Sequence, residues 1–367
     1  MQSQETTRAE QQTSAGPAVG RVLVVAGTHG NERNAPWLLR QALPPPFATD
    51  AAAAGQSAQR RSGQSDSEGG RDGSDRSQPP RLAIDTAGLA VVPVLGNPEA
   101  FADGRRYGDR DLNRCFAPEL LLDSRRQERE VERARALLAA HGPAGTEPCR
   151  VAIDLHSTTA AMGNSLVVYG RRPADLALAA AMQSDLGLPV YLHEADAAQT
   201  GFLAERWPAG LVIEVGPVPQ GVLTGVVIEQ TRLALEAGLR LLAEAREGRL
   251  RLPRSLVLHR HRLSLDLPRH PDGSPRAVIH PQRQNRDWQP LRAGDPIFLD
   301  HDGRSLPYEP PAKLAGETVW PVFINEAAYG EKGIAMSLTT REIWPVEASW
   351  RDALLELAAS LLPQAAG

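Results

Sequence analysis

The stretch VLVVAGTHGNE, residues 22–32, decides the fold of this chain, because a run of apolar residues passes directly into a polar turn. A short, continuous apolar run that ends in glycine is typical of a strand buried on both faces of a sheet. The ligands of open α/β sheets gather at the carboxyl ends of such strands. We therefore expect His29 and Glu32 at the end of a buried strand, where both side chains can reach one metal ion.

A second apolar run, residues 151–155, ends in the same way at His156. Two histidines and a glutamate supply three ligands, and three protein ligands with a fourth position left for water are typical of a catalytic zinc. Without a metal, His29 would stabilise a turn and Glu32 would be a solvated charge. Asp154 precedes His156 by two residues, and it either orients a metal ligand or caps the strand.

Glu214 lies within a third apolar run, residues 211–215, which is followed by Gly216-Pro217. A buried carboxylate is costly unless it is used or paired. Burial also raises the pKa of such a group, which suits a general base that takes a proton from a metal-activated water. The alternative is an ion pair between Glu214 and an arginine.

One loop concentrates polar residues, in Arg105-Arg106-Tyr107 and Asp111-Leu112-Asn113-Arg114. A guanidinium group can grip a carboxylate through two hydrogen bonds, and near zinc it can stabilise the oxyanion of a tetrahedral intermediate. The alternative is a solvated basic loop, because arginine is the default cation of this chain. Its only lysines are Lys313 and Lys332.

Composition limits the classes of partner. The chain has 367 residues, 42% of them hydrophobic, and can bury a sizeable core. A formal net charge of −4 gives no reason to expect nucleic acid or an anionic membrane as a partner. Cys115 and Cys149 form no metal-binding or disulfide pattern, and the N-terminus is polar, so we expect a cytoplasmic protein. Surface or structural roles are expected for the histidines that stand in no motif: His141, His193, His259, His261, His270 and His301.

Apolar runs that alternate with helical segments predict an α/β fold, with a mixed sheet covered by helices on both faces. We expect this catalytic domain over residues 20–247, after a disordered tail at 1–19. Residues 51–80 have almost nothing to bury, which predicts a disordered surface insertion or, alternatively, a binding segment. Short strands among Pro, Gly and Asp turns then predict a smaller β-rich C-terminal domain at residues 248–367.

Five motifs in one order resemble the aspartoacylase and aminoacylase-3 family, within the zinc carboxypeptidase-like superfamily. They are Gly27–Glu32, Arg106-Tyr107 with Asp111–Arg114, Asp154–Thr159 with Met162-Gly163, Ile213–Pro217 and Asn325–Tyr329. The resemblance covers residues 21–335 outside the insertion, and residues 279–296 match the family's C-terminal domain.

The resemblance implies a zinc-dependent deacylase of N-acyl amino acids, with one zinc ion per subunit held by His29, Glu32 and His156. Glu214 would be the general base and then the acid, and Arg106 would polarise the scissile carbonyl and stabilise its oxyanion. The C-terminal β domain would cap the site. The family also suggests a dimer or larger homo-oligomer. Substrate contacts would come from Arg106, Asn113, Arg114, Glu214 and Tyr329.

N-acetyl-L-aspartate is the leading substrate, cleaved to L-aspartate and acetate. One difference from the family pattern favours another substrate. Aspartoacylase carries an arginine and a tyrosine that help bind its acidic substrate, and both lie before the motif that corresponds to Ile213–Pro217. Phe202 stands in place of that arginine, although Arg206 could serve by another route. The alternative is a neutral or aromatic N-acyl amino acid, as in the aminoacylase-3 branch. A peptidase, which a narrow cleft would disfavour, and a non-catalytic zinc-binding protein are further candidates.

Overall fold

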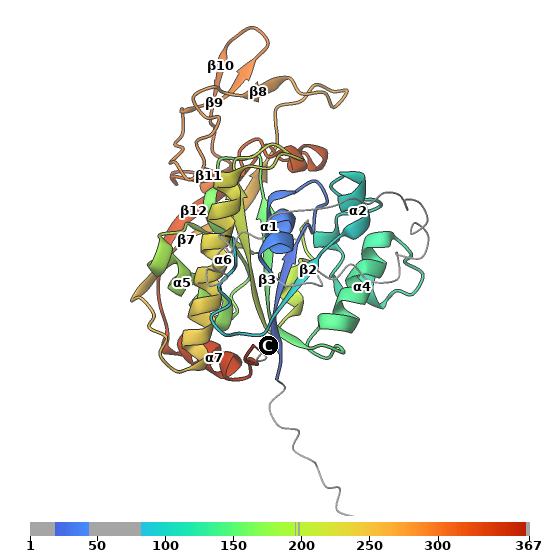
Figure 1. Ribbon diagram of the computed structural model, residues 1–367. Helices are drawn as coiled ribbons and strands as arrows, with labels where there is room; N and C mark the ends of the chain where they lie inside the picture. Colours follow the sequence, from blue (N-terminus) through green and yellow to red (C-terminus); the bar gives the residue numbers. More distant parts are fainter. Residues whose placement is uncertain (1–18, 44–81, 195, 197–198, 365–367) are drawn as a thin grey trace, which may run out of the picture.

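The computed structural model describes residues 19–43, 82–194, 196 and 199–364. The tail predicted at residues 1–19 lies outside this part of the chain except for Val19, and the insertion predicted at 51–80 lies outside it entirely. Two sheets organise the described residues, a large one of nine strands and a small one of three (Figure 1).

The large sheet is mixed, as the sequence predicts. Its strands are β1 (Arg21–Ala26), β2 (Val91–Leu95), β3 (Cys149–Ser157), β4 (Gly163–Tyr169), β5 (Val190–His193), β6 (Ala209–Gly216), β7 (Ser255–Leu265), β11 (Trp320–Val322) and β12 (Met336–Pro345). Their order is β11-β12-β7-β5-β4-β6-β3-β1-β2. Strands β2, β1, β3 and β6 pair in parallel, β4 runs antiparallel to β6, and β7, β12 and β11 pair antiparallel.

Helices cover both faces of this sheet. One face carries α1 (Asn34–Ala42), α5 (Pro173–Leu186), α6 (Gly225–Arg246) and α7 (Ala348–Ala359). The other carries α4 (Arg129–His141) and the 3-10 turns η1 (Leu112–Arg114) and η2 (Leu203–Arg206). Strand alternation explains the division, since Val22 and Val24 pack on the first face, and Leu23 and Val25 on the second. The predicted α/β architecture is therefore confirmed. None of the described helices combines the length and apolar character that a membrane span needs.

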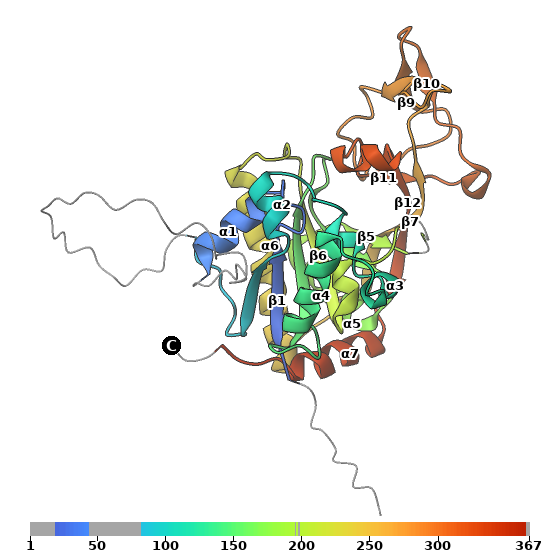
Figure 2. The same ribbon diagram turned by 90° about the vertical axis from the view of Figure 1, so that its right-hand side faces the viewer.

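The chain after α6 contributes to both sheets. The small sheet consists of β8 (Ala277–Ile279), β9 (Pro296–Asp300) and β10 (Ser305–Pro307), and it projects beyond one end of the molecule (Figure 2). Strand β7 pairs with β5 and so extends the large sheet, and α7 returns to pack beside α5 and α6. The domain boundary predicted after residue 247 falls between α6 and β7, and it stays a prediction.

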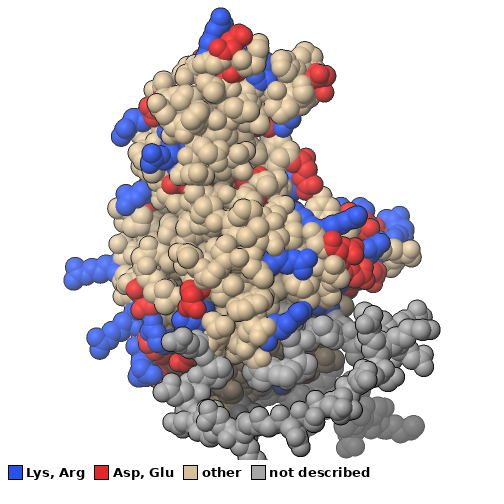
Figure 3. All heavy atoms as spheres, turned by 45° about the horizontal axis from the view of Figure 1, so that its top comes forward, with Lys and Arg blue, Asp and Glu red and all other residues tan. Residues whose placement is uncertain are grey.

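The carboxyl ends of β1, β3 and β6 share one edge of the large sheet, beneath the 3-10 turn η4 (Ala327–Lys332). The turn after β1 packs tightly on the short helix α2 (Pro98–Asp103), because a Cβ on Gly30 would lie 2.1 Å from the carbonyl carbon of Ala100. The Gly30 N–H donates to the Arg106 carbonyl at 3.0 Å, which ties two of the sequence motifs together. On the face seen in Figure 3, Lys and Arg side chains are interspersed with Asp and Glu.

Candidate active site

His29, Glu32 and His156 come together at the ends of β1 and β3. One ligand atom from each lies within 4.8 Å of the others, and all three side chains are buried. His29 Nδ1 is 2.6 Å from Glu32 Oε1, and His156 Nδ1 is 3.2 Å from Glu32 Oε2. Burial raises the pKa of Glu32, but the charges of His29 and His156 outweigh it and hold that pKa well below its usual value. The geometry is therefore one that could hold a cation.

The far nitrogen of each histidine contacts a second carboxylate. His29 Nε2 is 3.0 Å from Asp111 Oδ1, and His156 Nε2 is 2.8 Å from Asp154 Oδ2. An imidazole held this way by Nε2 presents Nδ1 to a metal. Of the two roles considered for Asp154, its contact with His156 is the one expected of a residue that orients this histidine. Sequence reasoning gave Asp111 no role, because its partner His29 lies 82 residues away.

Glu214 projects from β6 next to His156, its partner in the register of β3 with β6. Burial raises the pKa of Glu214 well above its usual value; His156 opposes this shift, and Glu32 and Glu326 add to it. The sequence left open an ion pair between Glu214 and an arginine. The described residues contain no such pair, and Arg106 pairs instead with Glu32 and Asp111. A buried, unpaired carboxylate beside the cluster is suited to proton transfer.

The other predicted site residues reach the same place. Arg106, Asn113, Arg114 and Tyr329 line one cavity together with the three cluster residues and Glu214. Asn113 Oδ1 accepts the Leu203 N–H at 2.9 Å. Tyr329 enters from η4, in the C-terminal part of the chain. Residues from all five sequence motifs thus line a single cavity.

Arg114 has a fixed position in the cavity wall. Its guanidinium donates to Gln199 Oε1 and to the Asn113 carbonyl, each at 2.7 Å, and its central carbon lies 4.1 Å from the centre of the Phe202 ring. The Phe202 ring in turn stacks on Tyr169, with 3.9 Å between centroids. Phe202 therefore supports an arginine here. Arg206 is exposed and does not line the cavity.

His193 also lines the cavity, although the sequence favoured a surface or structural role. Its Nε2 is 3.3 Å from the Gln199 carbonyl, which can only accept, and its Nδ1 is 3.2 Å from the Tyr191 hydroxyl. Burial lowers the pKa of His193 to about 4, and His261 lowers it further. His193 is the last residue of β5 and His156 is the last but one of β3, and this similar position is the signal that could have identified His193.

The C-terminal segment is held over the cavity by Glu326. Its buried carboxylate accepts the Thr159 N–H at 2.8 Å, the Thr159 hydroxyl at 2.9 Å and the Ala160 N–H at 3.3 Å, and it also accepts the Thr158 hydroxyl. These contacts join η4 to the loop that follows β3. They explain how Tyr329, remote in sequence, reaches the site.

Solved structures of the aminoacylase class share this architecture. Murine aminoacylase 3 aligns with a TM-score of 0.69 at 31% identity, covering 90% of this chain and 98% of that one. A family model described as the succinylglutamate desuccinylase/aspartoacylase catalytic domain matches residues 79–242, and one described as the AstE/AspA barrel-sandwich hybrid domain matches residues 254–341. The fold and the matches together define an amidohydrolase.

Relatives that carry names show to which family of amidohydrolases this chain belongs. A probable aspartoacylase of Synechococcus sp. (strain CC9605) is 55% identical over 339 residues, covering 92% of this chain and 98% of that protein. One of Parasynechococcus marenigrum (strain WH8102) is 54% identical over 336 residues, with the same coverage. The chain belongs to the succinylglutamate desuccinylase/aspartoacylase family, which confirms the resemblance read from its motifs. The catalytic match begins at residue 79, after the turn that carries His29 and Glu32.

Proposed function

We propose that this chain is a zinc-dependent amidohydrolase that removes the acyl group from N-acyl amino acids, with N-acetyl-L-aspartate as the leading substrate. The observation that carries the proposal is that the His29–Glu32–His156 cluster, a buried glutamate and two arginines face one cavity. Family membership supports an amide bond as the target. The names of the Synechococcus and Parasynechococcus relatives favour aspartate as the amino acid.

The donor set fits zinc. His29 and His156 would bind through Nδ1, because each Nε2 already contacts a carboxylate, and Glu32 would supply an oxygen. Three protein ligands leave a position open for water or substrate. When bound, zinc supplies a Lewis acid that lowers the pKa of a water molecule to about 7.

Glu214 is the proposed general base. Burial raises its pKa well above the usual value for a glutamate, which makes Glu214 a better proton acceptor than an exposed carboxylate. It takes one proton from the attacking water as the water oxygen bonds to the acyl carbon. It then delivers that proton to the amide nitrogen as the carbon–nitrogen bond breaks, which leaves a carboxylic acid and a free amine.

Arg106 is the proposed partner of the oxyanion. Its guanidinium lines the cavity, and its Nε–H is buried without a hydrogen-bond partner among the described residues. A buried donor without a partner is costly unless it is used. The developing negative charge on the scissile carbonyl oxygen would satisfy it.

Arg114, Asn113 and Tyr329 are proposed to bind the α-carboxylate of the substrate. Arg114 is fixed by Gln199 and stacked on Phe202, so little side-chain freedom is lost when it grips a carboxylate. Burial raises the pKa of Tyr329, so its phenol stays protonated and can donate a hydrogen bond.

A second candidate substrate is a neutral or aromatic N-acyl amino acid. Among the residues that line the cavity, the guanidinium groups are those of Arg106 and Arg114, and both already have proposed partners. The neutral side chains of Phe202 and Tyr169 line the cavity beside Arg114, and no further guanidinium among the described lining residues is left for the second carboxylate of N-acetylaspartate. This observation favours an uncharged side chain, whereas the names of the relatives favour aspartate.

A substrate panel tests the proposal. The zinc-loaded protein is offered N-acetylaspartate, N-acetylphenylalanine, N-acetylalanine and N-succinylglutamate, and release of free amine is followed. We expect hydrolysis of at least one N-acetyl amino acid, with Glu214→Gln as the matched inactive control. Zinc-loaded protein that releases no amine from any of them would show that the function is wrong and would favour a peptidase or a non-catalytic zinc protein. The cytoplasmic location and the homo-oligomeric state stay predictions.

A further inference from the structure

We propose that Asp111 is a positioning residue that joins the metal centre to the oxyanion arginine. One oxygen of its carboxylate orients His29, and the other holds Arg106. The inference rests on the proposed function, since it needs His29 as a ligand and Arg106 at the scissile carbonyl. It gives a role to the first residue of the Asp111–Arg114 motif, which the proposed reaction leaves unused.

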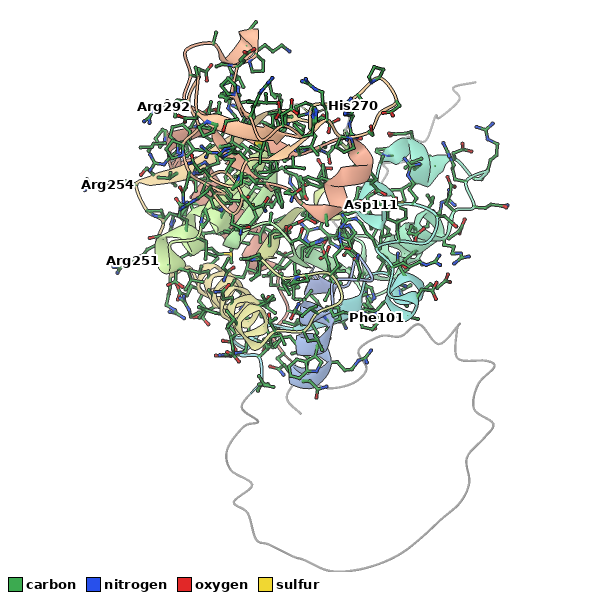
Figure 4. The ribbon with its side chains drawn as sticks, turned by 90° about the horizontal axis from the view of Figure 1, so that it is seen from above. Phe101, Asp111, Arg251, Arg254, His270 and Arg292 are labelled. Atoms are coloured by element: carbon green, nitrogen blue, oxygen red, sulfur yellow. The ribbon has the colours of Figure 1, made fainter. Side chains whose placement is uncertain are left out.

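The two oxygens of Asp111 have different partners. Oδ1 lies 3.0 Å from His29 Nε2 and also accepts the Asn113 N–H at 3.0 Å. Oδ2 lies 3.4 Å from an Arg106 terminal nitrogen and 3.2 Å from Lys332 Nζ. The side chain is only 7% exposed, so water screens these contacts little. Seen from above, Asp111 lies beside the red-orange turn η4 that carries Lys332 (Figure 4).

Asp154 provides an internal comparison. It contacts His156 as Asp111 contacts His29, but its other oxygen accepts the Thr28 hydroxyl at 2.7 Å. Each carboxylate therefore orients one histidine of the cluster. The second contact of Asp154 is with the neutral Thr28 hydroxyl, which has no proposed part in the reaction. The second contact of Asp111 is with Arg106, the cation proposed to lie at the reacting carbonyl.

Arg106 depends on Asp111 for its position. Its two ion pairs are with Glu32 Oε1 at 3.5 Å and with Asp111 Oδ2 at 3.4 Å, and its Nε–H has no partner among the described residues. If Glu32 binds zinc, the metal ion neutralises much of its negative charge. Asp111 is then the ion-pair partner that still holds the guanidinium in place for the oxyanion.

Lys332 links the same carboxylate to the C-terminal segment. It is one of only two lysines in the chain, and it lies three residues after Tyr329 in η4. An ammonium group is a compact point charge, so it can share Oδ2 with a guanidinium without competing for a flat, two-bond arrangement. The Asp111 carboxylate thus contacts His29 as the proposed metal ligand, Arg106 as the proposed oxyanion donor, and Lys332 in η4.

Two matched variants test the proposal, Asp111→Asn and Asp154→Asn. Zinc affinity is measured by competition with a chelator, and kcat and KM are measured at saturating zinc on the best substrate of the panel. Both variants should bind zinc about 10- to 100-fold more weakly, because the partner of a ligand histidine loses its negative charge in each. At saturating zinc, Asp154→Asn should lose no more than about 10-fold in kcat, whereas Asp111→Asn should stay about 100- to 1000-fold below the wild type through the misplaced oxyanion donor. Its KM should change less than its kcat, since Arg114 keeps its own contacts with Gln199 and Asn113.

A double variant shows whether Asp111 acts through Arg106. Arg106→Ala and Arg106→Ala/Asp111→Asn should have equal kcat at saturating zinc, because the second change has no guanidinium left to misplace. Asp111→Glu, which keeps the charge, should restore part of the lost kcat. A wild-type kcat for Asp111→Asn, or an equal kcat defect in both aspartate variants, would overturn the proposal. If the wild-type protein cleaves no substrate, the proposed function fails. The zinc affinities still test whether Asp111 orients His29. An affinity of Asp111→Asn equal to that of the wild type would overturn that role.

Discussion

The two ends of the cavity are built from different chemistry. The reaction end, defined by His29, Glu32, His156 and Glu214, consists of ionisable groups, with His29 and His156 each within 3.2 Å of a Glu32 oxygen. The reading end, defined by Tyr169, Tyr191, His193 and Phe202, consists of neutral rings that stack and hydrogen-bond to one another.

This difference indicates that catalysis and substrate choice depend on separate groups of residues. Buried ionisable groups are costly, so a chain that keeps four of them together has a use for them. Neutral rings cost less to bury than charged groups, and we expect that they can be exchanged for other side chains while His29, Glu32 and His156 stay together. The reaction end is therefore expected to fix the chemistry, and the reading end to set the substrate.

The largest effect is expected from His156→Ala, which breaks the reaction end. Loss of one of three ligands should weaken zinc binding by more than about 100-fold, beyond the loss for an outer partner of a ligand, and should abolish turnover. Metal analysis after dialysis measures it. His193→Ala, at the reading end, is the matched control and should retain zinc. Stoichiometric zinc in His156→Ala would refute its role as a ligand.

An intermediate effect is expected from Phe202→Arg, which gives the reading end a cation. The ratio of kcat/KM for N-acetylaspartate to that for N-acetylphenylalanine should rise about 10- to 100-fold, the value of one new charge-assisted contact. Phe202→Met, which stays neutral, should leave the ratio near its wild-type value. An unchanged ratio in Phe202→Arg, with zinc still bound, would mean that Phe202 does not face the substrate side chain.

The smallest effect is a pH dependence of stability that arises at the reading end. Burial lowers the pKa of His193 to about 4 from the usual 6.5, so between these values the unfolded chain binds a proton that the folded chain does not. The free energy of unfolding should therefore fall as the pH falls through this window, by about 2 kcal/mol from this group between pH 6.5 and pH 5. Urea unfolding at several pH values measures it. His193→Asn should show a shallower fall, and an equal fall in both proteins would contradict the assignment.

The parts of the fold that could be read from the sequence are those with a clear apolar pattern. Strands β1, β3 and β6 consist mainly of apolar residues because both faces of the sheet are covered, and α6 carries a clear amphipathic repeat. Helix α5 is apolar on nearly all sides, so it shows no stripe to identify it. Strand β12 mixes buried and exposed positions and contains polar residues, and its place in the large sheet follows from pairing with β7.

The candidate site divides in the same way. His29, Glu32, His156 and Glu214 could be found because each ends or interrupts an apolar run. Contacts between side chains far apart in sequence could not, such as Asp111 with Lys332 across 221 residues or Thr158 with Glu326 across 168. These pairs depend on how the C-terminal segment folds back over the sheet, which no local pattern encodes.

The most direct test of the account is Glu214→Gln in zinc-loaded protein, with metal content and amine release measured on the same sample. Glutamine keeps the size of the side chain and removes its ability to take a proton. We expect zinc to remain stoichiometric while kcat falls about 100- to 10,000-fold, the usual contribution of a general base. Turnover near the wild-type rate with zinc bound would contradict the account, because the reaction end would then not perform the chemistry that its buried charges indicate.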